Sequence, residues 1–407
     1  MVRRFALLSA VIGSLAFPTA TQAQQNADMA TQEFQAWLQT VRTEASQKGV
    51  SNQTLDEALA NLKPIDRVLE LDKRQPEFTR TFWDYIGRAV SPDRIERGRK
   101  LLRQHADLFR DVYARNGVQG RFLVAFWGLE TNFGDHTGGF PVIGALATLA
   151  HDPRRSDFFR AELMNALTIL DHKHITLDRM EGSWAGAMGQ TQFMPSTFVR
   201  YAKDGDGDKK IDIWGSLPDV MESASNYLSS VGWKRDETWG REVRLPKGFD
   251  LDLVDLDIRH SLSEWQKMGV RRADGGNLPI VAGMKASLVL PAGYKGPAFL
   301  VYNNFNKIMV WNRSIYYAIA VGHLADRIAG KPAISVKRPA NDKAISRTKV
   351  IEMQTALNEL GYDVGKPDGI MGSQTRGAIK DYQRATGLPA DGYATISLIE
   401  QLQKAVQ

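Results

Sequence analysis

The clearest sign of chemistry is a single glutamate at the end of an apolar run. Residues 126–134 read Phe-Trp-Gly-Leu-Glu-Thr-Asn-Phe-Gly and place Glu130 among aromatic side chains. Burial disfavours the charged form of a carboxylic acid, so such surroundings raise its pKa and keep it protonated near neutral pH. An acid tuned in this way can protonate a glycosidic oxygen. An exposed glutamate at a helix end is the alternative interpretation.

A glycine-rich segment offers polar and aromatic groups that suit a sugar. Residues 182–198 read Gly-Ser-Trp-Ala-Gly-Ala-Met-Gly-Gln-Thr-Gln-Phe-Met-Pro-Ser-Thr-Phe. Glycine lets the backbone approach a ligand closely. Ser183 and Gln192 are able to hydrogen-bond a polar substrate, and Trp184 and Phe193 to stack on sugar faces. A tight turn before a helix would also explain the segment.

An acidic loop follows. Counted from Asp204, acids stand at positions 1, 3, 5 and 9, which resembles the start of an EF-hand calcium loop. Two positions depart from that pattern, because position 6 is Lys209 instead of glycine and position 12 is Gly215 instead of glutamate. The loop is therefore either a cation site or a solvated acidic turn.

Apolar spacing predicts a mainly helical chain (α+β) around these segments. Phe34, Trp37, Leu38 and Val41 follow the i, i+3, i+4, i+7 spacing of a helix. A Ser-Pro pair at residues 91–92 is typical of a helix start. We expect helices over 92–116, 158–172, 219–231 and 311–327. Short apolar runs between turns predict strands over 285–289 and 299–301.

Three motifs in order resemble one enzyme family, the lytic murein transglycosylases of the membrane-bound lytic transglycosylase B type (glycoside hydrolase family 103). They are the Glu130 segment, the glycine-rich segment and Trp-Asn-Arg-Ser-Ile-Tyr-Tyr at residues 311–317. The resemblance covers roughly residues 34–329. It implies a lysozyme-like catalytic domain with helical and small β additions. Some family members are lipoproteins, but this chain has no cysteine to carry the lipid, so it is similar to the soluble members.

The resemblance also implies roles for individual residues. In this family the glutamate of the first motif is the acid and base, which corresponds to Glu130. The other matching positions are substrate-binding ones: Ser183, Gln192, Tyr227, Asn312 and Tyr317. Members with a calcium loop take their last acid from just beyond it. The implied ligands of a structural calcium ion are thus Asp204, Asp206, Asp208, the Lys210 carbonyl and Asp219. No cofactor is expected for the chemistry.

A single carboxylate suits this reaction better than ordinary glycoside hydrolysis. Most glycosidases need two carboxylates that flank the scissile bond. A lytic transglycosylase cleaves the MurNAc-β-1,4-GlcNAc bond with one group, which acts as acid and then as base. Asp135 is a possible second carboxylate, in a loop-like neighbourhood. The rival hypotheses are therefore a hydrolytic muramidase and a wall-binding scaffold without activity.

The C-terminal residues have a pattern of their own. Helical stripes and the sequence Asp-Gly-Ile-Met-Gly-Ser-Gln-Thr-Arg at residues 368–376 resemble the peptidoglycan-binding domain 1 module, which implies three helices and docking to cell wall. Residues 330–346 hold prolines and lysines without periodicity, as a linker does. The expected organisation is a signal peptide (1–23), a catalytic region (24–329), a linker (330–346) and a wall-binding domain (347–407).

The N-terminus and the composition indicate export. Arg3 and Arg4 precede an apolar stretch and small residues before Ala23, as in a secretory signal peptide. The chain of 407 residues has 52 basic and 46 acidic residues, hence a formal charge of +6. No P-loop, dinucleotide-binding glycine motif, zinc-peptidase motif or nucleophile elbow is present. We expect a soluble periplasmic protein that binds peptidoglycan glycan strands, without nucleic-acid partners or stable membrane insertion.

Overall fold

The computed structural model describes residues 20–73, 80–340 and 342–407, with side chains from residue 31 onward. The predicted signal peptide lies outside the described residues except for its last four, which begin helix α1 (Ala20–Gln47). Among the described residues, no helix is long and apolar enough to cross a membrane.

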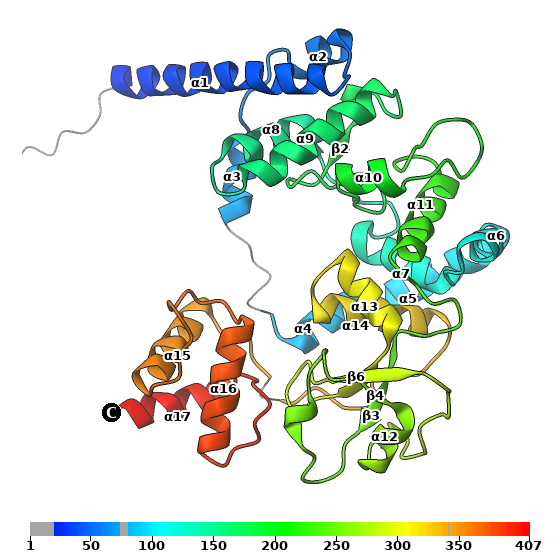
Figure 1. Cartoon of the computed structure of the whole chain (residues 1–407), viewed down its shortest axis with the longest axis vertical. Helices are drawn as coiled ribbons and strands as arrows, with labels where there is room; N and C mark the ends of the chain where they lie inside the picture. Colours follow the sequence, from blue (N-terminus) through cyan, green and yellow to red (C-terminus); the bar gives the residue numbers. More distant parts are fainter. Residues whose placement is uncertain (1–19, 74–79, 341) are drawn as a thin grey trace, which may run out of the picture.

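Helices are the main elements of residues 20–328 (Figure 1). After α1 they are α2 (Asn52–Leu59), α3 (Asp66–Lys73), α4 (Phe82–Ala89), α5 (Pro92–Gln104), α6 (Ala106–Asn116), α7 (Gly120–Thr131), α8 (Val142–His151), α9 (Ser156–Asp171), α10 (Pro195–Tyr201), α11 (Leu217–Ser230), α13 (Asn303–Trp311) and α14 (Ile315–Ile328). Several start at a hydroxyl N-cap such as Ser51, Thr81 or Ser91, which accepts a hydrogen bond from an N–H of the first turn.

Helix α7 passes through the centre of the largest core. Residues 122–128 are all buried, as expected for a helix that is apolar on every side. It packs against α14 and α5, while α8 and α9 form a second closely packed pair. The end of α7 that carries Glu130 is therefore held by helices from distant parts of the chain.

A small sheet is inserted between α11 and α13. Its strands are antiparallel in the order β4-β6-β7-β3-β5. They are β3 (Gly240–Arg244), β4 (His260–Ser261), β5 (Arg271–Arg272), β6 (Lys285–Val289) and β7 (Ala298–Val301). Trp265 of α12 (Leu262–Lys267) is fully buried against this sheet, and its Nε1–H donates to the Ala286 carbonyl at 2.9 Å. The predicted strands at 285–289 and 299–301 are confirmed.

The three helices predicted for the C-terminal residues are present. They are α15 (Arg347–Glu359), α16 (Ser373–Ala385) and α17 (Ile396–Val406), and they enclose a separate apolar core. Inside it, the buried amide of Gln354 donates to Asp368 Oδ1 at 3.0 Å and accepts from the Gly369 N–H at 2.8 Å. The mainly helical fold class with a small β part is thus confirmed.

Two of the predicted helices are divided. The helix expected over 92–116 breaks at His105, which separates α5 from α6. The helix expected over 311–327 starts only at Ile315, because Ser314 caps it and Trp311 ends the preceding helix. Apolar spacing continues across both breaks, so periodicity alone could not reveal them. The helices expected over 158–172 and 219–231 are found as α9 and α11.

The segment predicted as a linker contacts both the small sheet and helix α4. Residues 330–346 contain no helix or strand where they are described. Ser335 donates to Glu242 through its N–H at 2.8 Å and its hydroxyl at 2.9 Å, and Arg338 pairs with Asp84 at 2.9 Å. The segment is therefore anchored along its length.

The C-terminal helices lie next to the small sheet in Figure 1, and polar contacts join them. Arg384 pairs with Asp252 at 2.6 Å, and the Tyr294 N–H donates to Asp391 Oδ2 at 2.9 Å. Both side chains of the ion pair are more than half exposed. Solvent screens a pair that is exposed to this degree, so it adds little to stability.

Candidate active site

Glu130 lies in the last turn of α7, where the chain reverses. Asn132, Phe133 and Gly134 all adopt left-handed φ values, of 52°, 63° and 88°. Phe133 folds back under the helix, and a Cβ at Gly128 would lie only 2.8 Å from its ring. The small residue at 128 therefore permits the sharp turn that ends the helix beside Glu130.

Two donors from the third motif hold one oxygen of Glu130. Trp311 Nε1–H donates to Glu130 Oε1 at 3.0 Å, and the hydroxyl of Tyr317 donates to the same oxygen. Trp311 ends α13 and Tyr317 lies in the first turn of α14, so the break between these helices delivers both donors to one atom. The structure therefore brings the first and third motifs into direct contact.

The surroundings of Glu130 change its acidity. Burial raises the pKa of the Glu130 carboxyl to about 7, against the hydrogen bonds from Tyr317 and Trp311, which lower it. Burial and the neighbouring carboxyl also raise the pKa of Tyr317 well above its usual value, so that the phenol stays a hydrogen-bond donor. Near neutral pH, the protonated and the carboxylate forms of Glu130 are therefore both populated.

Aromatic rings pack around this carboxyl. Trp311 lies 4.5 Å from Phe126, 5.1 Å from Tyr227 and 5.3 Å from Phe193, measured between ring centroids. Tyr227 is partly buried, and its hydroxyl donates to the Val310 carbonyl at 3.4 Å. The rings account for the desolvation of Glu130, and Tyr227 joins the site through Trp311.

The glycine-rich segment lies against the same helix end. Thr131 Oγ1–H donates to the Gln190 carbonyl at 2.8 Å, and Trp127 Nε1–H donates to the Gln190 side chain at 2.8 Å. The hydroxyl of Ser183 accepts from the Ala187 N–H at 3.0 Å. Gln192 Nε2–H donates to the Thr137 carbonyl at 2.9 Å. Ser183 and Gln192 therefore bond to backbone near Glu130 and not to Glu130 itself.

Asn312, the other predicted residue of the third motif, does not bond to Glu130. Asn312 is exposed, and its side-chain oxygen accepts from the Ser314 N–H at 3.2 Å. Its neighbour Trp311, which touches Glu130, was not among the residues predicted for the site. Its position in the third motif was an available signal, but an indole next to an asparagine reads equally well as core packing.

Asp135, the possible second carboxylate, is held by other partners. It forms a two-pronged ion pair with Arg97, whose Nη2–H donates to Asp135 Oδ1 at 2.8 Å, and it accepts from Asn132 at 3.0 Å. The hydrogen bond from Arg97 lowers the pKa of Asp135 to about 2, so this carboxyl is charged at neutral pH. Asp135 is exposed and holds the loop after α7 in place.

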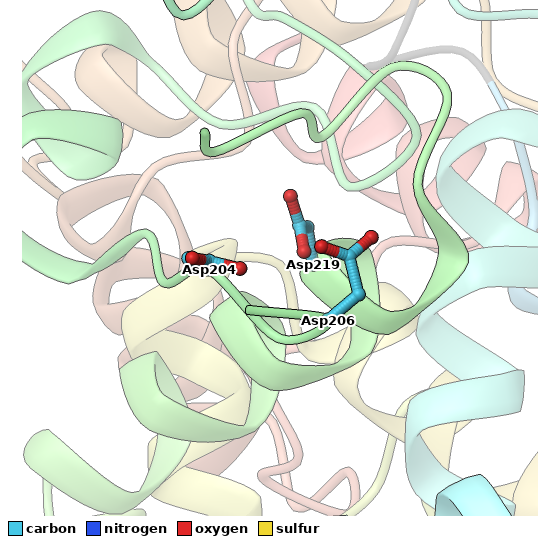
Figure 2. Close-up of side chains that lie close together, drawn as sticks. All are labelled: Asp204, Asp206 and Asp219. Atoms are coloured by element: carbon cyan, nitrogen blue, oxygen red, sulfur yellow. The ribbon is translucent and has the colours of Figure 1, made fainter. Parts of the chain in front are cut away.

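The acidic loop gathers three of the five predicted calcium ligands. Carboxylate oxygens of Asp204, Asp206 and Asp219 lie within 4.8 Å of one another (Figure 2). Burial raises the pKa of Asp219, and the nearby charge of Asp206 raises it further. Asp208 lies outside this group, and its carboxylate accepts from the Lys210 N–H at 2.7 Å. Three crowded acids with oxygen ligands suit a hard cation such as calcium.

Comparisons with known proteins agree with this arrangement. Residues 33–326 match the family described as transglycosylase SLT domain, and residues 346–402 match the peptidoglycan binding domain family. The chain is 31% identical over 297 residues to membrane-bound lytic murein transglycosylase B of Escherichia coli. The aligned region covers 69% of this chain and 79% of that protein.

Solved structures are similar over the same regions. Crystal structures of SltB3 from Pseudomonas aeruginosa, bound to NAG-anhNAM-pentapeptide or NAG-NAM-pentapeptide, superpose with a TM-score of 0.88 at 48% identity. They cover 91% of this chain and 99% of that one. The Escherichia coli lytic transglycosylase Slt35 in complex with calcium has a TM-score of 0.61 at 29% identity, over 72% of this chain and 91% of its own. The lysozyme-like fold expected from the sequence is confirmed.

Proposed function

This chain belongs to the lytic murein transglycosylases, and we propose that Glu130 is its single catalytic acid and base, acting on the MurNAc-β-1,4-GlcNAc bond of peptidoglycan. The observation that carries the proposal is one carboxyl whose pKa burial raises to about 7, with two donors on the same oxygen. A group that is protonated in part at the working pH serves equally well as acid and as base.

In the first half of the reaction Glu130 acts as an acid. Its Oε2 carries the proton, because Oε1 accepts both hydrogen bonds, and the proton passes to the glycosidic oxygen. The bond from that oxygen to C1 of MurNAc breaks, and GlcNAc leaves with a free hydroxyl. The N-acetyl carbonyl oxygen of MurNAc stabilises the positive charge that develops at C1. The hydrogen bonds from Trp311 and Tyr317 stabilise the new carboxylate.

In the second half Glu130 acts as a base. Its carboxylate takes the proton of the C6 hydroxyl of MurNAc, and that oxygen bonds to C1. The product is 1,6-anhydro-MurNAc, no water is consumed, and Glu130 is protonated again. Because the C6 hydroxyl is the nucleophile, the reaction needs no second carboxylate as a nucleophile or a water-activating base. Asp135 is paired to Arg97 instead.

The substrate-binding residues form part of the same proposal. Tyr317 orients Glu130, while Tyr227 presents an aromatic face beside Trp311. Ser183, Gln192 and the exposed Asn312 offer hydroxyl and amide groups to the sugar and its N-acetyl substituents. What supports their assignment is the position of their segments at the two sides of the Glu130 helix end.

We also propose a structural calcium ion in the acidic loop. Asp204, Asp206 and Asp219 would supply carboxylate oxygens, with Asp208 and the Lys210 carbonyl completing the set. The cation would offset the repulsion among the acids and join the loop to the first turn of α11. The crowding of these three acids and the raised pKa of Asp219 support this site.

The remaining proposals concern organisation and location. We propose a signal peptide over 1–23, a catalytic region over 24–329, a linker over 330–346 and a wall-binding domain over 347–407, in a protein that works in the periplasm. A wall-binding domain next to the enzyme raises the effective concentration of the active site at the polymer.

The test is the mass of the products released from purified sacculi by the mature protein, residues 24–407. We expect anhydro-muropeptides, which are lighter by one water than the reducing products of a muramidase. The Glu130→Gln variant should lose at least about 100-fold in rate, the usual contribution of a general acid–base group. Reducing products, or full activity in the variant, would contradict the mechanism. A protein that pellets with sacculi but releases nothing would be a binding scaffold.

A further inference from the structure

Gln190 makes a hydrogen bond with each of its polar groups, and together these bonds connect the end of α7 to the last residues of the acidic loop. Toward α7, its side-chain oxygen accepts from Trp127 Nε1–H and its carbonyl accepts from Thr131 Oγ1–H, both at 2.8 Å. These two residues stand three positions before and one position after Glu130. Gln190 therefore bonds to the helix turn that carries Glu130 both before and after this residue.

The other groups of Gln190 face the opposite direction. Its N–H donates to the Ile213 carbonyl at 2.9 Å, and its Nε2–H donates to the Trp214 carbonyl at 2.8 Å. Residues 213 and 214 directly follow Asp212, whose N–H donates to Asp219 in the first turn of α11 at 2.6 Å. A single side chain thus links the helix of Glu130 to the loop that precedes α11.

The neighbouring glycines leave the space that Gln190 occupies. A Cβ at Gly134 would lie 2.5 Å from Gln190 Oε1, and a Cβ at Gly189 would lie 2.6 Å from Ile213. Both glycines also have left-handed φ values, of 88° and 63°. Tight backbone on both sides leaves the amide of Gln190 little freedom to move.

From these contacts we infer that Gln190 is a positioning residue, which sets the position of Glu130 through Trp127 and Thr131. The inference rests on the catalytic role proposed for Glu130. A misplacement of about 1 Å at a reacting group can cost about 100-fold in rate, even when the cause lies outside the reacting atoms. A loosened helix end would also admit water and reduce the desolvation of Glu130.

Gln190→Met tests the inference, because methionine keeps the length of the side chain and removes both of its hydrogen bonds. We expect kcat for anhydro-muropeptide release to fall about 10- to 100-fold, with KM changed less than about 2-fold. The alkaline limb of the pH profile should move to lower pH, since partial hydration of Glu130 lowers its pKa. Gln35→Met is the matched control. It removes a 2.8 Å bond from α1 to the Leu62 carbonyl, in the segment between α2 and α3, and should leave both readouts unchanged.

A second variant tests the inference if Gln190→Met does not fold. Trp127→Phe removes the Nε1–H donor together with part of the buried ring, and it should lower kcat in the same way. In the double variant the two losses should overlap, because they remove the same hydrogen bond. Wild-type kcat and pH profile in Gln190→Met, or fully additive losses, would overturn the inference. Activity in Glu130→Gln would instead overturn the proposed function, so the two failures are distinguishable.

Discussion

At the scale of single residues, the acidity of Glu130 results from two opposing effects. Burial among aromatic rings raises its pKa to about 7, and hydrogen bonds from Tyr317 and Trp311 act in the opposite direction. Without the donors its pKa would be higher and the group would be a weaker acid, and without burial it would be a carboxylate that has no proton to give. The balance lets one group serve both halves of the reaction.

Tyr317→Phe should therefore move the pH dependence in a defined direction. The lost hydrogen bond stabilised the carboxylate, so the pKa of Glu130 rises and the alkaline limb of kcat/KM moves to higher pH. We also expect kcat to fall about 10-fold, the cost of a hydrogen bond to a charged group. The profile is measured by anhydro-muropeptide release between pH 5 and pH 9.

The matched control is Tyr316→Phe, at the preceding residue of the same helix. The Tyr316 ring packs at 5.6 Å on Phe82, and this contact survives the substitution. Its profile should match that of the wild type. An alkaline limb that stays in place in Tyr317→Phe would show that this hydrogen bond does not tune Glu130.

At the scale of elements, the site is built from segment ends. Glu130 lies in the last turn of α7, Trp311 is the last residue of α13 and Tyr317 lies in the first turn of α14. The acidic loop leads to the first turn of α11. Side chains at helix ends converge on one point more easily than side chains from the middle of packed helices. The stability of the loops between these ends then determines how well the site is held.

Calcium should stabilise the protein through the acidic loop. Adding the ion to chelator-treated protein at about 100 times its dissociation constant should contribute about 2.7 kcal/mol and raise the unfolding temperature. Asp219→Asn should abolish this increase, because it removes the buried carboxylate of the group. Thermal unfolding with and without calcium is the measurement.

Asp274→Asn is the control for this prediction. Asp274 lies in an exposed turn near the small sheet, where it pairs with Arg272, and is no member of the acidic group. The variant should keep the full response to calcium. An equal response in Asp219→Asn would place the ion somewhere else.

At the scale of the whole molecule, the C-terminal domain has its own core and is joined to the rest by contacts that include polar ones. Arg384 with Asp252 and Asp391 with the Tyr294 N–H are among them. The cores of the two regions consist of separate sets of buried residues. The catalytic region should therefore keep its fold and chemistry when the domain is removed.

A protein ending at residue 346 should separate binding from catalysis. We expect unchanged kcat on soluble glycan fragments and binding to sacculi weakened by about 100-fold or more, because the second attachment is lost. Pelleting with sacculi and turnover of soluble fragments measure the two quantities. Arg384→Ala keeps the domain and should bind as the wild type does, whereas unweakened pelleting of the shortened protein would contradict a wall-binding role.

Local patterns were sufficient for much of this protein. The apolar run before Glu130, the glycine-rich segment and the acidic loop are contiguous, so their residue types could be read directly from the chain. Several helices followed from apolar periodicity, since burial of one face leaves its mark on every third or fourth residue, and the two predicted strands followed from short apolar runs between turns. The three C-terminal helices were recognisable for the same reason.

Other features arose only when distant segments met. Trp311 reaches Glu130 across 181 positions of the chain, and its role depends on a helix break that apolar spacing does not record. The pKa of Glu130 near 7, the pairing of Asp135 with Arg97 and the bridge made by Gln190 likewise require partners from other elements. Residue types and spacing set which groups are available, but hydrogen bonds and desolvation depend on distances in space, and the tertiary packing alone decides those.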